Sequence, residues 1–323
     1  MATPAASARD VARAFEDNKL AQVLYHDWEA QTYDEKWSIS FDERCRSIVR
    51  ERFMRVLEST RHPGESLPYG TVLELGAGTG FFSLNLKQAG LVEDVHVCDL
   101  SPGMVAAAKA NAQRLGFTIE GQVADAEALP FRDDSFDLVV GHAVLHHIPD
   151  VEAALREVLR VLRPGGRFVI AGEPTTIGHW YARHLGRLTW ETATRVTRLP
   201  FLRDKWAREQ AELDESSRAA ALEAVVDLHT FDPAELAETA RRAGADAVGT
   251  ATEELLSAFA GWPIRTFEYA VPEGALGFGW AKFAYRTWTT LMKVDSALDG
   301  VVPQRFFYNV GVSGVKPQKT PGR

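Results

Sequence analysis

The chain has 323 residues, of which 46% are hydrophobic and 25% are charged, a globular composition that suffices for one large domain or one domain with insertions. Its formal net charge of −8 argues against a general nucleic-acid-binding surface. The N-terminus lacks the apolar core of a signal peptide, and no apolar run is long enough to span a bilayer, so we expect a cytoplasmic protein.

The first part of the chain, residues 1–67, mixes charged and aromatic residues and has no glycine before Gly64. This pattern predicts a helical N-terminal cover that ends in the turn-rich segment 62–68. We expect the main domain to occupy residues 68–323 and to carry two cap insertions, 175–230 and 253–304.

A strand predicted at Val72–Leu75 runs into a turn that contains Gly76, Gly78 and Gly80. Glycines in such a turn let the backbone approach a ligand closely, because no Cβ atom intervenes. The spacing differs from the dinucleotide pattern, since Phe81 stands where that pattern has its third glycine, and no Gly-Lys-Ser/Thr follows to make a phosphate-binding P-loop. The turn therefore predicts a nucleoside-like ligand without a pyrophosphate.

The next predicted strand, Val95–Asp99, ends in an acidic residue about 20 positions beyond the turn, the interval at which a carboxylate reaches ribose hydroxyls. Ser101 is expected to cap the following helix, with Pro102 at its first position. Cys98 lies in this strand, far in sequence from Cys45, which favours a buried, reduced thiol over a disulfide.

Short apolar runs continue to alternate with helical periods along the chain. Asp150 is expected to cap a helix that stops at Pro164-Gly165-Gly166. This alternation predicts a doubly wound, Rossmann-like α/β fold with a seven-stranded, mostly parallel sheet and helices on both faces. The remaining strands are predicted at Phe117–Val123, Phe136–His142, Arg167–Ala171, Ala247–Thr252 and Phe306–Val312.

In this order, the segments resemble class I S-adenosylmethionine-dependent methyltransferases of the small-molecule, type 11/25-like branch. The resemblance is dense over residues 71–172 and implies transfer of a methyl group from the cofactor S-adenosylmethionine to a small molecule. The segments that carry it are Glu74–Gly80, Asp99–Met104, Asp125–Phe131 followed by Phe136–Val140, Val144–Ile148 and Leu162–Phe168.

The resemblance also implies the roles of the residues in a cofactor site. Backbone amides of the turn would meet the cofactor's carboxylate at a helix start, Asp99 would accept both ribose hydroxyls, and Asp125 would accept the adenine amine. The segment Trp28–Asp34 is similar to a lid in which Tyr33 closes over the cofactor, and a surface helix packed on the core is its alternative. The expected cofactor residues are Tyr33, Glu74, Gly76, Ala77, Gly78, Gly80, Asp99, Leu100, Met104, Asp125, Ala126 and His142.

Methyl transfer is an in-line displacement at carbon, so the main task is alignment, and a base is needed only for a weakly acidic or protonated acceptor. The catalytic candidates are His142 and His146, which follow the fourth strand with His147, and Glu173, which ends the fifth, where ligands of parallel sheets bind. Structural packing of the histidines and a capping role for Glu173 are the alternatives. The spacing of His142 and His146 would suit a metal only if both residues lay on one helix. Because His142 is predicted to end a strand, we expect no metal site.

The two cap insertions differ in character. In the first, arginines lie on one side of a predicted helix and apolar residues on another, which predicts a basic amphipathic helix. It would contact an anionic membrane or substrate, or form an ordinary cap with a solvated face. The second insertion is rich in aromatic residues, which favours an apolar or lipid-like acceptor, with core packing as the alternative. The arginines are Arg183, Arg187, Arg195 and Arg198, and the apolar residues are Tyr181, Leu185, Leu188, Val196 and Leu199.

Two other functions stay open at this point. One is a non-catalytic, S-adenosylmethionine-binding regulatory module, and the other is an NAD-dependent enzyme, against which Phe81 argues. A small-molecule substrate is expected and a nucleic-acid partner is not. The pattern leaves open whether oxygen, nitrogen or carbon accepts the methyl group, and it leaves the oligomeric state open.

Overall fold

The computed structural model describes residues 17–30, 32–37, 39–60, 66–210, 212–213, 226–272 and 274–318. Residues 1–16 of the predicted cover lie outside this part of the chain, as does most of the predicted turn at 62–68.

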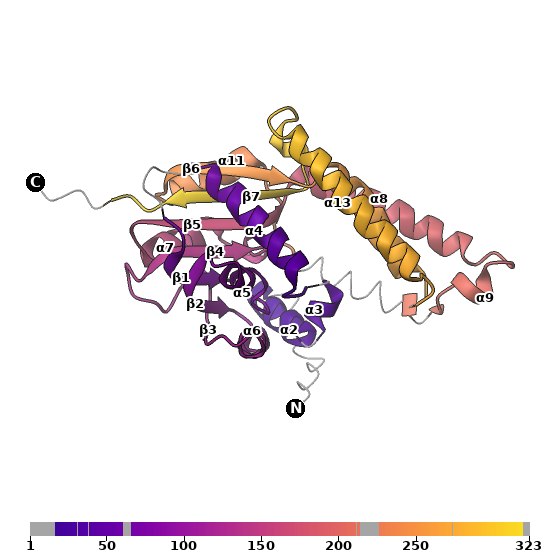
Figure 1. Cartoon of the computed structure of the whole chain (residues 1–323), viewed down its shortest axis with the longest axis horizontal. Coiled ribbons are helices and arrows are strands. Elements are labelled where there is room, and N and C mark those ends of the chain that lie inside the picture. Colours follow the sequence, from indigo (N-terminus) through magenta and orange to yellow (C-terminus); the bar gives the residue numbers. More distant parts are fainter. Residues whose placement is uncertain are drawn as a thin grey trace, which may run out of the picture.

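Seven strands form one sheet in the order β3-β2-β1-β4-β5-β7-β6 (Figure 1). Strand β7 runs antiparallel to β5 and β6, and the other neighbours pair in parallel. The predicted doubly wound, mostly parallel seven-stranded sheet is therefore confirmed. The strands are β1 (Tyr69–Leu75), β2 (Val92–Asp99), β3 (Glu120–Val123), β4 (Phe136–His142), β5 (Leu162–Pro174), β6 (Asp246–Glu253) and β7 (Asn309–Val315).

The strand ends differ from the predicted ones in three places. Strand β3 starts late because Gly116, with φ 77°, closes the preceding helix and the chain needs residues 117–119 to reach the sheet. Strand β5 starts early and includes the segment predicted as a helix stop, because the Gly165 amide donates to the Lys316 carbonyl at 2.9 Å. Phe306 lies in the short helix η2 (Gln304–Phe306) rather than in the last strand.

Helices cover both faces of the sheet, as predicted. Phe53 and Phe82 pack with the sheet on one face, and Leu155, Val158 and Leu236 pack on the other. The first face carries α4 (Glu43–Glu58), α5 (Phe81–Gln88) and α6 (Pro102–Arg114), and the second carries α7 (Val151–Val161) and α11 (Pro233–Arg242).

Two predicted helix starts are made by capping side chains. The Ser101 hydroxyl accepts the Met104 amide at 3.0 Å at the start of α6. The Asp150 carboxylate accepts the Ala153 amide at 2.9 Å at the start of α7. These caps satisfy amides that have no partner within the helix, and they fix where the chain leaves each loop.

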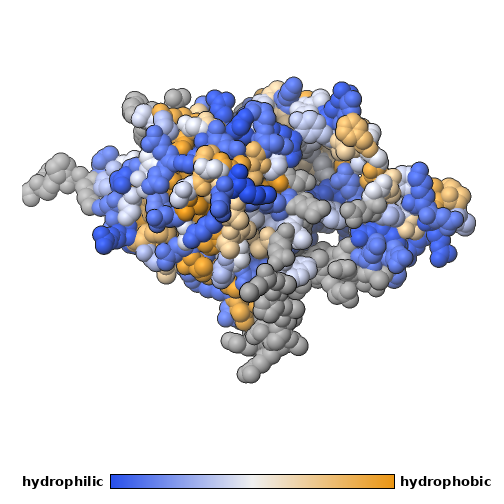
Figure 2. Space-filling view, turned by 60° about the horizontal axis from the view of Figure 1, so that its bottom comes forward, coloured by the Kyte–Doolittle hydropathy of each residue, from blue (hydrophilic) through white to orange (hydrophobic). Residues whose placement is uncertain are grey.

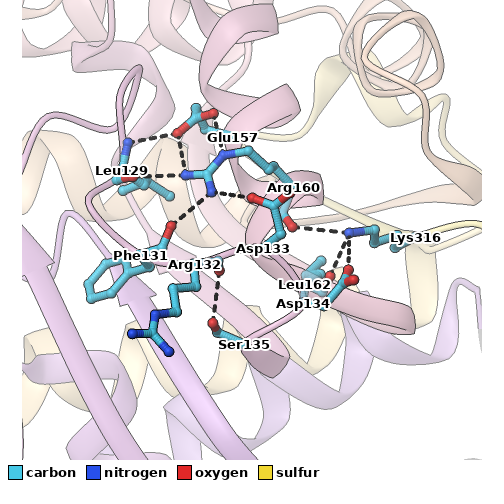
Figure 3. Close-up of polar contacts among 10 residues, drawn as sticks. All are labelled: Leu129, Phe131, Arg132, Asp133, Asp134, Ser135, Glu157, Arg160, Leu162 and Lys316. Atoms are coloured by element: carbon cyan, nitrogen blue, oxygen red, sulfur yellow. Dashed lines mark hydrogen bonds and ion pairs between the residues drawn. The ribbon is translucent and has the colours of Figure 1, made fainter.

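The loop between β3 and β4 is held by two basic side chains (Figure 3). Arg160 donates to the carbonyls of Leu129 and Phe131, each at 2.8 Å, and pairs with Glu157, whose pKa it holds below the usual range. Lys316 donates to Oδ1 of Asp134 in the loop and to the Leu162 carbonyl of β5, each at 2.7 Å. This loop begins directly after β3, so the network limits movement of the segment that follows that strand.

The N-terminal helices α2 (Asn18–Glu29) and α3 (Tyr33–Lys36) lie beside the carboxyl ends of β1 and β2. The segments predicted as cap insertions contain helices that form a layer, in which α12 (Leu256–Ala270) packs between α8 (Thr176–Val196) and α13 (Phe278–Leu298). This layer projects beyond the sheet and is followed at its far end by α9 (Arg203–Trp206) (Figure 1).

The cap layer is held together by a buried carboxylate of α13. Asp295 accepts the amides of Leu255, Leu256 and Ser257, at 3.0, 2.8 and 3.0 Å, and thereby caps the start of α12. Among the described residues, no helix combines the length and the apolar composition needed to cross a membrane.

Candidate functional site

A cavity of about 1410 Å³ lies at the carboxyl ends of the strands, between the glycine turn, the N-terminal helices and the inner side of the cap. Ligands of doubly wound sheets bind at this edge. The cavity is larger than the roughly 300–1,000 Å³ typical of a site for one small molecule. It therefore has room for a nucleoside-sized ligand and a second molecule.

The three glycines of the turn all have left-handed backbone angles, with φ 57° at Gly76, 52° at Gly78 and 83° at Gly80. A Cβ atom at Gly76 would lie 2.2 Å from a methyl group of Val144, and one at Gly80 would lie 2.8 Å from Leu84. At Gly78 the nearest atom would be Cε1 of Tyr33, at 3.9 Å. The outer glycines are thus needed for packing, whereas Gly78 leaves ligand space open.

Asp99 lies at the end of β2, directly across from the turn. Its Oδ2 accepts the Gly78 amide at 2.8 Å and its Oδ1 accepts the Ser101 amide at 2.9 Å. Burial raises the pKa of Asp99, and hydrogen bonds from the amides of Ser101, Gly78 and Leu100 oppose that rise. A carboxylate accepts about four hydrogen bonds, so Asp99 keeps acceptor capacity for a ligand hydroxyl.

Glu74 lies under the turn and is almost fully buried. Its carboxylate accepts the Ser83 amide at 3.2 Å and the Ser83 hydroxyl, which ties the start of α5 to β1. Burial raises its pKa to about 7. Glu74 also borders the cavity, so its fixed position shapes the floor beneath the ligand space.

Asp125 follows β3 and faces the N-terminal helix α2. Its Oδ2 lies 2.6 Å from Nζ of Lys19, which also pairs with Glu127, and these carboxylates raise the pKa of Lys19. Asp125 Oδ1 accepts the Glu127 amide at 2.9 Å. Leu100, Met104, Ala126 and Ala77 border the cavity with these residues.

Helices α2 and α3 are fastened across the turn by two further carboxylates. Asp27 accepts the Gly103 amide at 2.9 Å. Asp34 accepts the Thr79 hydroxyl at 2.5 Å and the Asn111 amide group at 3.2 Å. These contacts place Tyr33 beside the ligand space at Gly78, the position expected of the predicted lid; opening and closing of the segment stay predictions.

His142 ends β4 and borders the cavity, but its Nε2 accepts a hydrogen bond from Arg52 at 2.6 Å. Arg52 is itself held by Glu253 and by Glu254, the latter at 2.9 Å. Burial and the nearby Arg52 charge lower the pKa of His142 well below 6.5. The ring is therefore neutral at pH 7, and the ring nitrogen that would accept a proton is already engaged.

Glu173 and His146 form a hydrogen-bonded pair. The Glu173 carboxylate, fully buried, accepts the Val144 and Leu145 amides at 2.9 Å each, the His146 amide at 3.1 Å and Nδ1–H of His146 at 2.8 Å. Its acceptor positions are therefore filled, and it orients the His146 ring. His146 borders the cavity, with Nε2 3.8 Å from Oδ1 of Asp227.

His146, His147 and Asp227 place possible metal-ligating atoms within 4.8 Å of one another. However, Nδ1 of His147 lies 3.0 Å from the Val226 carbonyl, so in this arrangement that nitrogen carries a proton and donates it. A metal ligand must offer a lone pair instead. The expectation of no metal site stays a prediction.

The cap end of the cavity is aromatic. Trp262 packs against Tyr308 with ring centroids 5.3 Å apart, and both border the cavity with Tyr285 and Trp288. Phe267 packs elsewhere, against Trp280 at 5.2 Å. The aromatic insertion therefore both lines the cavity and packs within the cap.

Sequence reasoning missed Arg52, Glu254 and Asp227, which lie in the site. Arg52 is 90 positions from His142 and 202 from Glu254 along the chain. No local motif marks such residues. The one available signal was the pair of acids at the end of the predicted strand preceding the second insertion.

Comparisons with known proteins agree with this geometry. Residues 73–170 match the family described as "Methyltransferase domain". The chain is 45% identical over 109 residues to demethylmenaquinone methyltransferase of Beutenbergia cavernae, which is 34% of this chain and 41% of that protein. It is 35% identical over 158 residues to the protein of the same name in Corynebacterium glutamicum, 48% of this chain and 64% of that protein. The matches thus span less than two thirds of either relative.

Two solved structures share the fold over most of the chain. One is phosphoethanolamine N-methyltransferase 2 of Haemonchus contortus with S-adenosylhomocysteine, with a TM-score of 0.54, 17% identity, and coverage of 94% of this chain and 60% of that one. The other is the [4+2]-cyclase SpnF, with a TM-score of 0.51, 17% identity, and coverage of 94% and 97%. At these identities the likeness concerns the fold alone, since one fold hosts several reactions.

Proposed function

Because residues 73–170 match the methyltransferase-domain family, we propose that the chain transfers a methyl group from S-adenosylmethionine to a small-molecule acceptor. The observation that carries the proposal is the cavity that joins the glycine turn and Asp99 to an aromatic cap. Its volume suits a cofactor at one end and an acceptor at the other.

The residues of the turn fit this cofactor, which has a ribose diol and an adenine amine but no phosphate. The space that a Cβ atom at Gly78 would fill is open, and Asp99 retains acceptor capacity for a ribose hydroxyl. Asp125 would accept a hydrogen bond from the adenine amine, either after its contact with Lys19 is broken or while it contacts both groups. When bound, the cofactor supplies an electrophilic methyl group on a sulfonium sulfur.

The acceptor we propose is apolar or lipid-like. Trp262, Trp288 and Tyr308 offer extensive apolar contact area at the cap end. Arg183 and Arg265 also border this end, so an acidic or phosphate-bearing group on an otherwise apolar acceptor would find positive partners there.

For acceptors that must lose a proton, we propose His146 as the general base and Glu173 as the residue that positions it. Glu173 accepts the Nδ1 proton, which fixes the tautomer in which Nε2 is the basic nitrogen that takes a proton from the acceptor. We propose that His142 lines the cofactor space and does not act as the base, because its Nε2 accepts a hydrogen bond from Arg52.

The test has two parts. Calorimetry with S-adenosylmethionine and, separately, NADH measures cofactor choice; binding of NADH alone would contradict the proposal. Incubation with methyl-labelled S-adenosylmethionine and a panel of acceptors, including demethylmenaquinone, then measures transfer. Tight cofactor binding without label transfer to any acceptor would favour the non-catalytic binding module instead.

A further inference from the structure

The outer side of the cap displays apolar side chains to solvent. Phe201 is 80% exposed and Phe278 is 83% exposed. We call the exposed part of α8, residues 197–205 and α13 the cap surface. Its exposed apolar residues are Trp180, Leu188, Val196, Leu199, Phe201, Phe278, Phe283, Tyr285 and Val294. Nine such residues on α8, α13 and the segment after α8 are more than the single exposed apolar residues that are ordinary on a protein surface, which favours an interaction surface.

The predicted separation of basic and apolar sides on the first cap helix holds only in part. Tyr181 and Leu185 pack into the cap interior. Leu188 and Val196, in contrast, are exposed on the same helix as the exposed Arg187 and Arg195. Apolar and cationic side chains therefore share one surface, and Figure 2 shows hydrophobic and hydrophilic patches side by side at this projecting end.

The cap surface is basic although the chain is acidic. Residues 176–205 contain six Lys or Arg against two acids, Glu191 and Asp204, and residues 278–294 contain three Lys or Arg and no acid. These segments thus carry a net charge of +7 in a chain whose net charge is −8. A charge separation of this size orients the molecule toward an anionic surface.

A smaller cavity at the far end of the cap surface adds a feature suited to phosphate. It has a volume of about 500 Å³, and its lining includes Arg198, Arg203 and Arg208 together with the carboxylates of Asp204 and Glu209. Arg198 also pairs with a side-chain oxygen of Gln210 at 2.5 Å. The Arg208 guanidinium is engaged by Glu212 at 2.9 Å and by the Tyr269 carbonyl at 2.6 Å, so Arg198 and Arg203 are the cationic residues that would meet the oxygens of a lipid phosphate.

The mouth of the main cavity includes residues of the cap surface. Tyr285 and Tyr269 are 48% and 41% exposed and also line the main cavity. Arg183 is likewise exposed and lines it. If another surface contacts these residues, a molecule that leaves that surface would enter the cavity directly, without crossing bulk water.

We propose that the cap surface docks on an anionic phospholipid membrane, with its apolar side chains inserted at the headgroup level and its arginines on the phosphates. A nucleic-acid partner would pair with the basic residues but would leave Phe201 and Phe278 exposed to water. A face that stays solvated would have no use for either aromatic residue, whereas a membrane interface uses both kinds of side chain. The docking stands on the surface alone. Its consequence, entry of an apolar acceptor from the membrane through the mouth, rests on the proposed function.

The experiment is sedimentation of the full chain with vesicles of phosphatidylcholine alone and of equal parts phosphatidylcholine and phosphatidylglycerol, at low and high salt. We expect pelleting with the mixed vesicles that weakens as salt rises. Arg195→Gln/Arg198→Gln should lower the partition coefficient about 25-fold at low salt, about five-fold for each charge near the surface. Phe201→Ser/Phe278→Ser should lower it at both salt concentrations.

Matched controls separate the cap surface from general charge and exposure. Arg241→Gln/Arg242→Gln removes two exposed charges from α11, and Trp28→Ser removes an exposed aromatic residue from α2; all should pellet as wild type does. Circular dichroism and S-adenosylmethionine affinity check that each variant is folded. Equal pelleting of wild type and the arginine variant, or displacement from vesicles by RNA but not by salt, would overturn the proposal. Loss of docking with intact methyl transfer in detergent would leave the proposed function standing.

Discussion

The two ends of the cavity are held in place by different kinds of contact. At the turn end, Gly78, Asp99 and Ser101 are linked by amide-to-carboxylate hydrogen bonds of 2.8 and 2.9 Å. At the cap end, Trp262 and Trp288 come from α12 and α13, two helices that pack against each other. The turn end is fixed by backbone geometry and suits one invariant cofactor. The cap end is shaped by side-chain packing, and substitutions there can more readily adapt the cavity to a different acceptor.

The largest effect should come from filling the turn end. Gly78→Val places side-chain atoms in the open ligand space and should abolish S-adenosylmethionine binding in calorimetry. Gly90→Val is the matched control, because Gly90 has a similar positive φ of 69°, a Cβ atom there would meet nothing within 4 Å, and the residue does not line the cavity. If the two variants bind the cofactor equally well, the turn does not contact it.

Removing the proposed base should act on turnover and spare binding. His146→Gln is expected to lower kcat by roughly 100- to 10,000-fold for an acceptor that must lose a proton, with cofactor affinity unchanged. Glu173→Gln should give a smaller loss and shift the pH profile of kcat, because the ring loses the carboxylate that orients it. An unchanged pH profile in both variants would remove His146 from the chemistry.

Asp99 should matter for cofactor binding to an intermediate degree. Asp99→Ala deletes a charged acceptor for ribose hydroxyls and should weaken S-adenosylmethionine binding by roughly 1–3 kcal/mol in calorimetry. Asp94→Ala, an exposed acid of the same strand, should leave the affinity as it is. Equal affinities for wild type and Asp99→Ala would show that Asp99 does not bind the ribose hydroxyls.

Acid should destabilise the histidine-rich edge of the site. His142 and His147 have pKa values lowered by burial, so the unfolded chain takes up their protons first as the pH falls below about 6.5. The stability they contribute is present above that pH and is lost below it, by at most about 1.4 kcal/mol per pH unit for each histidine. Urea unfolding of His147→Gln between about pH 7 and pH 5 should show a shallower dependence than wild type. The exposed His184→Gln serves as the control.

The smallest effect is expected when the cap end changes and the cofactor is measured. Arg183, Arg187, Arg195 and Arg198 lie outside the contacts of the turn, so changing all four to glutamine should alter S-adenosylmethionine affinity by less than about 0.5 kcal/mol. A larger change would mean that the two ends of the cavity are coupled rather than independent.

The turn end was predictable because its determinants are local. Gly76, Gly78 and Asp99 have backbone or strand-end roles that a short pattern encodes. The anchors Asp27, Asp34 and Lys19 were not predictable, because polar residues on a surface helix carry no signal of their partners. At the cap end, composition indicated helices and aromatic packing, but only the tertiary structure separates cavity-lining Trp262 from Phe267 and Trp280, which pack against each other and do not line the cavity.

Transfer of label tests the central claim, that one cavity joins a cofactor to an apolar acceptor, most directly. Wild type would be incubated with methyl-labelled S-adenosylmethionine and a lipid extract, and the organic phase would be analysed for labelled small molecules. We expect label in an apolar product with wild type and none with Gly78→Val. Label confined to water-soluble products, or equal label from both proteins, would contradict the claim.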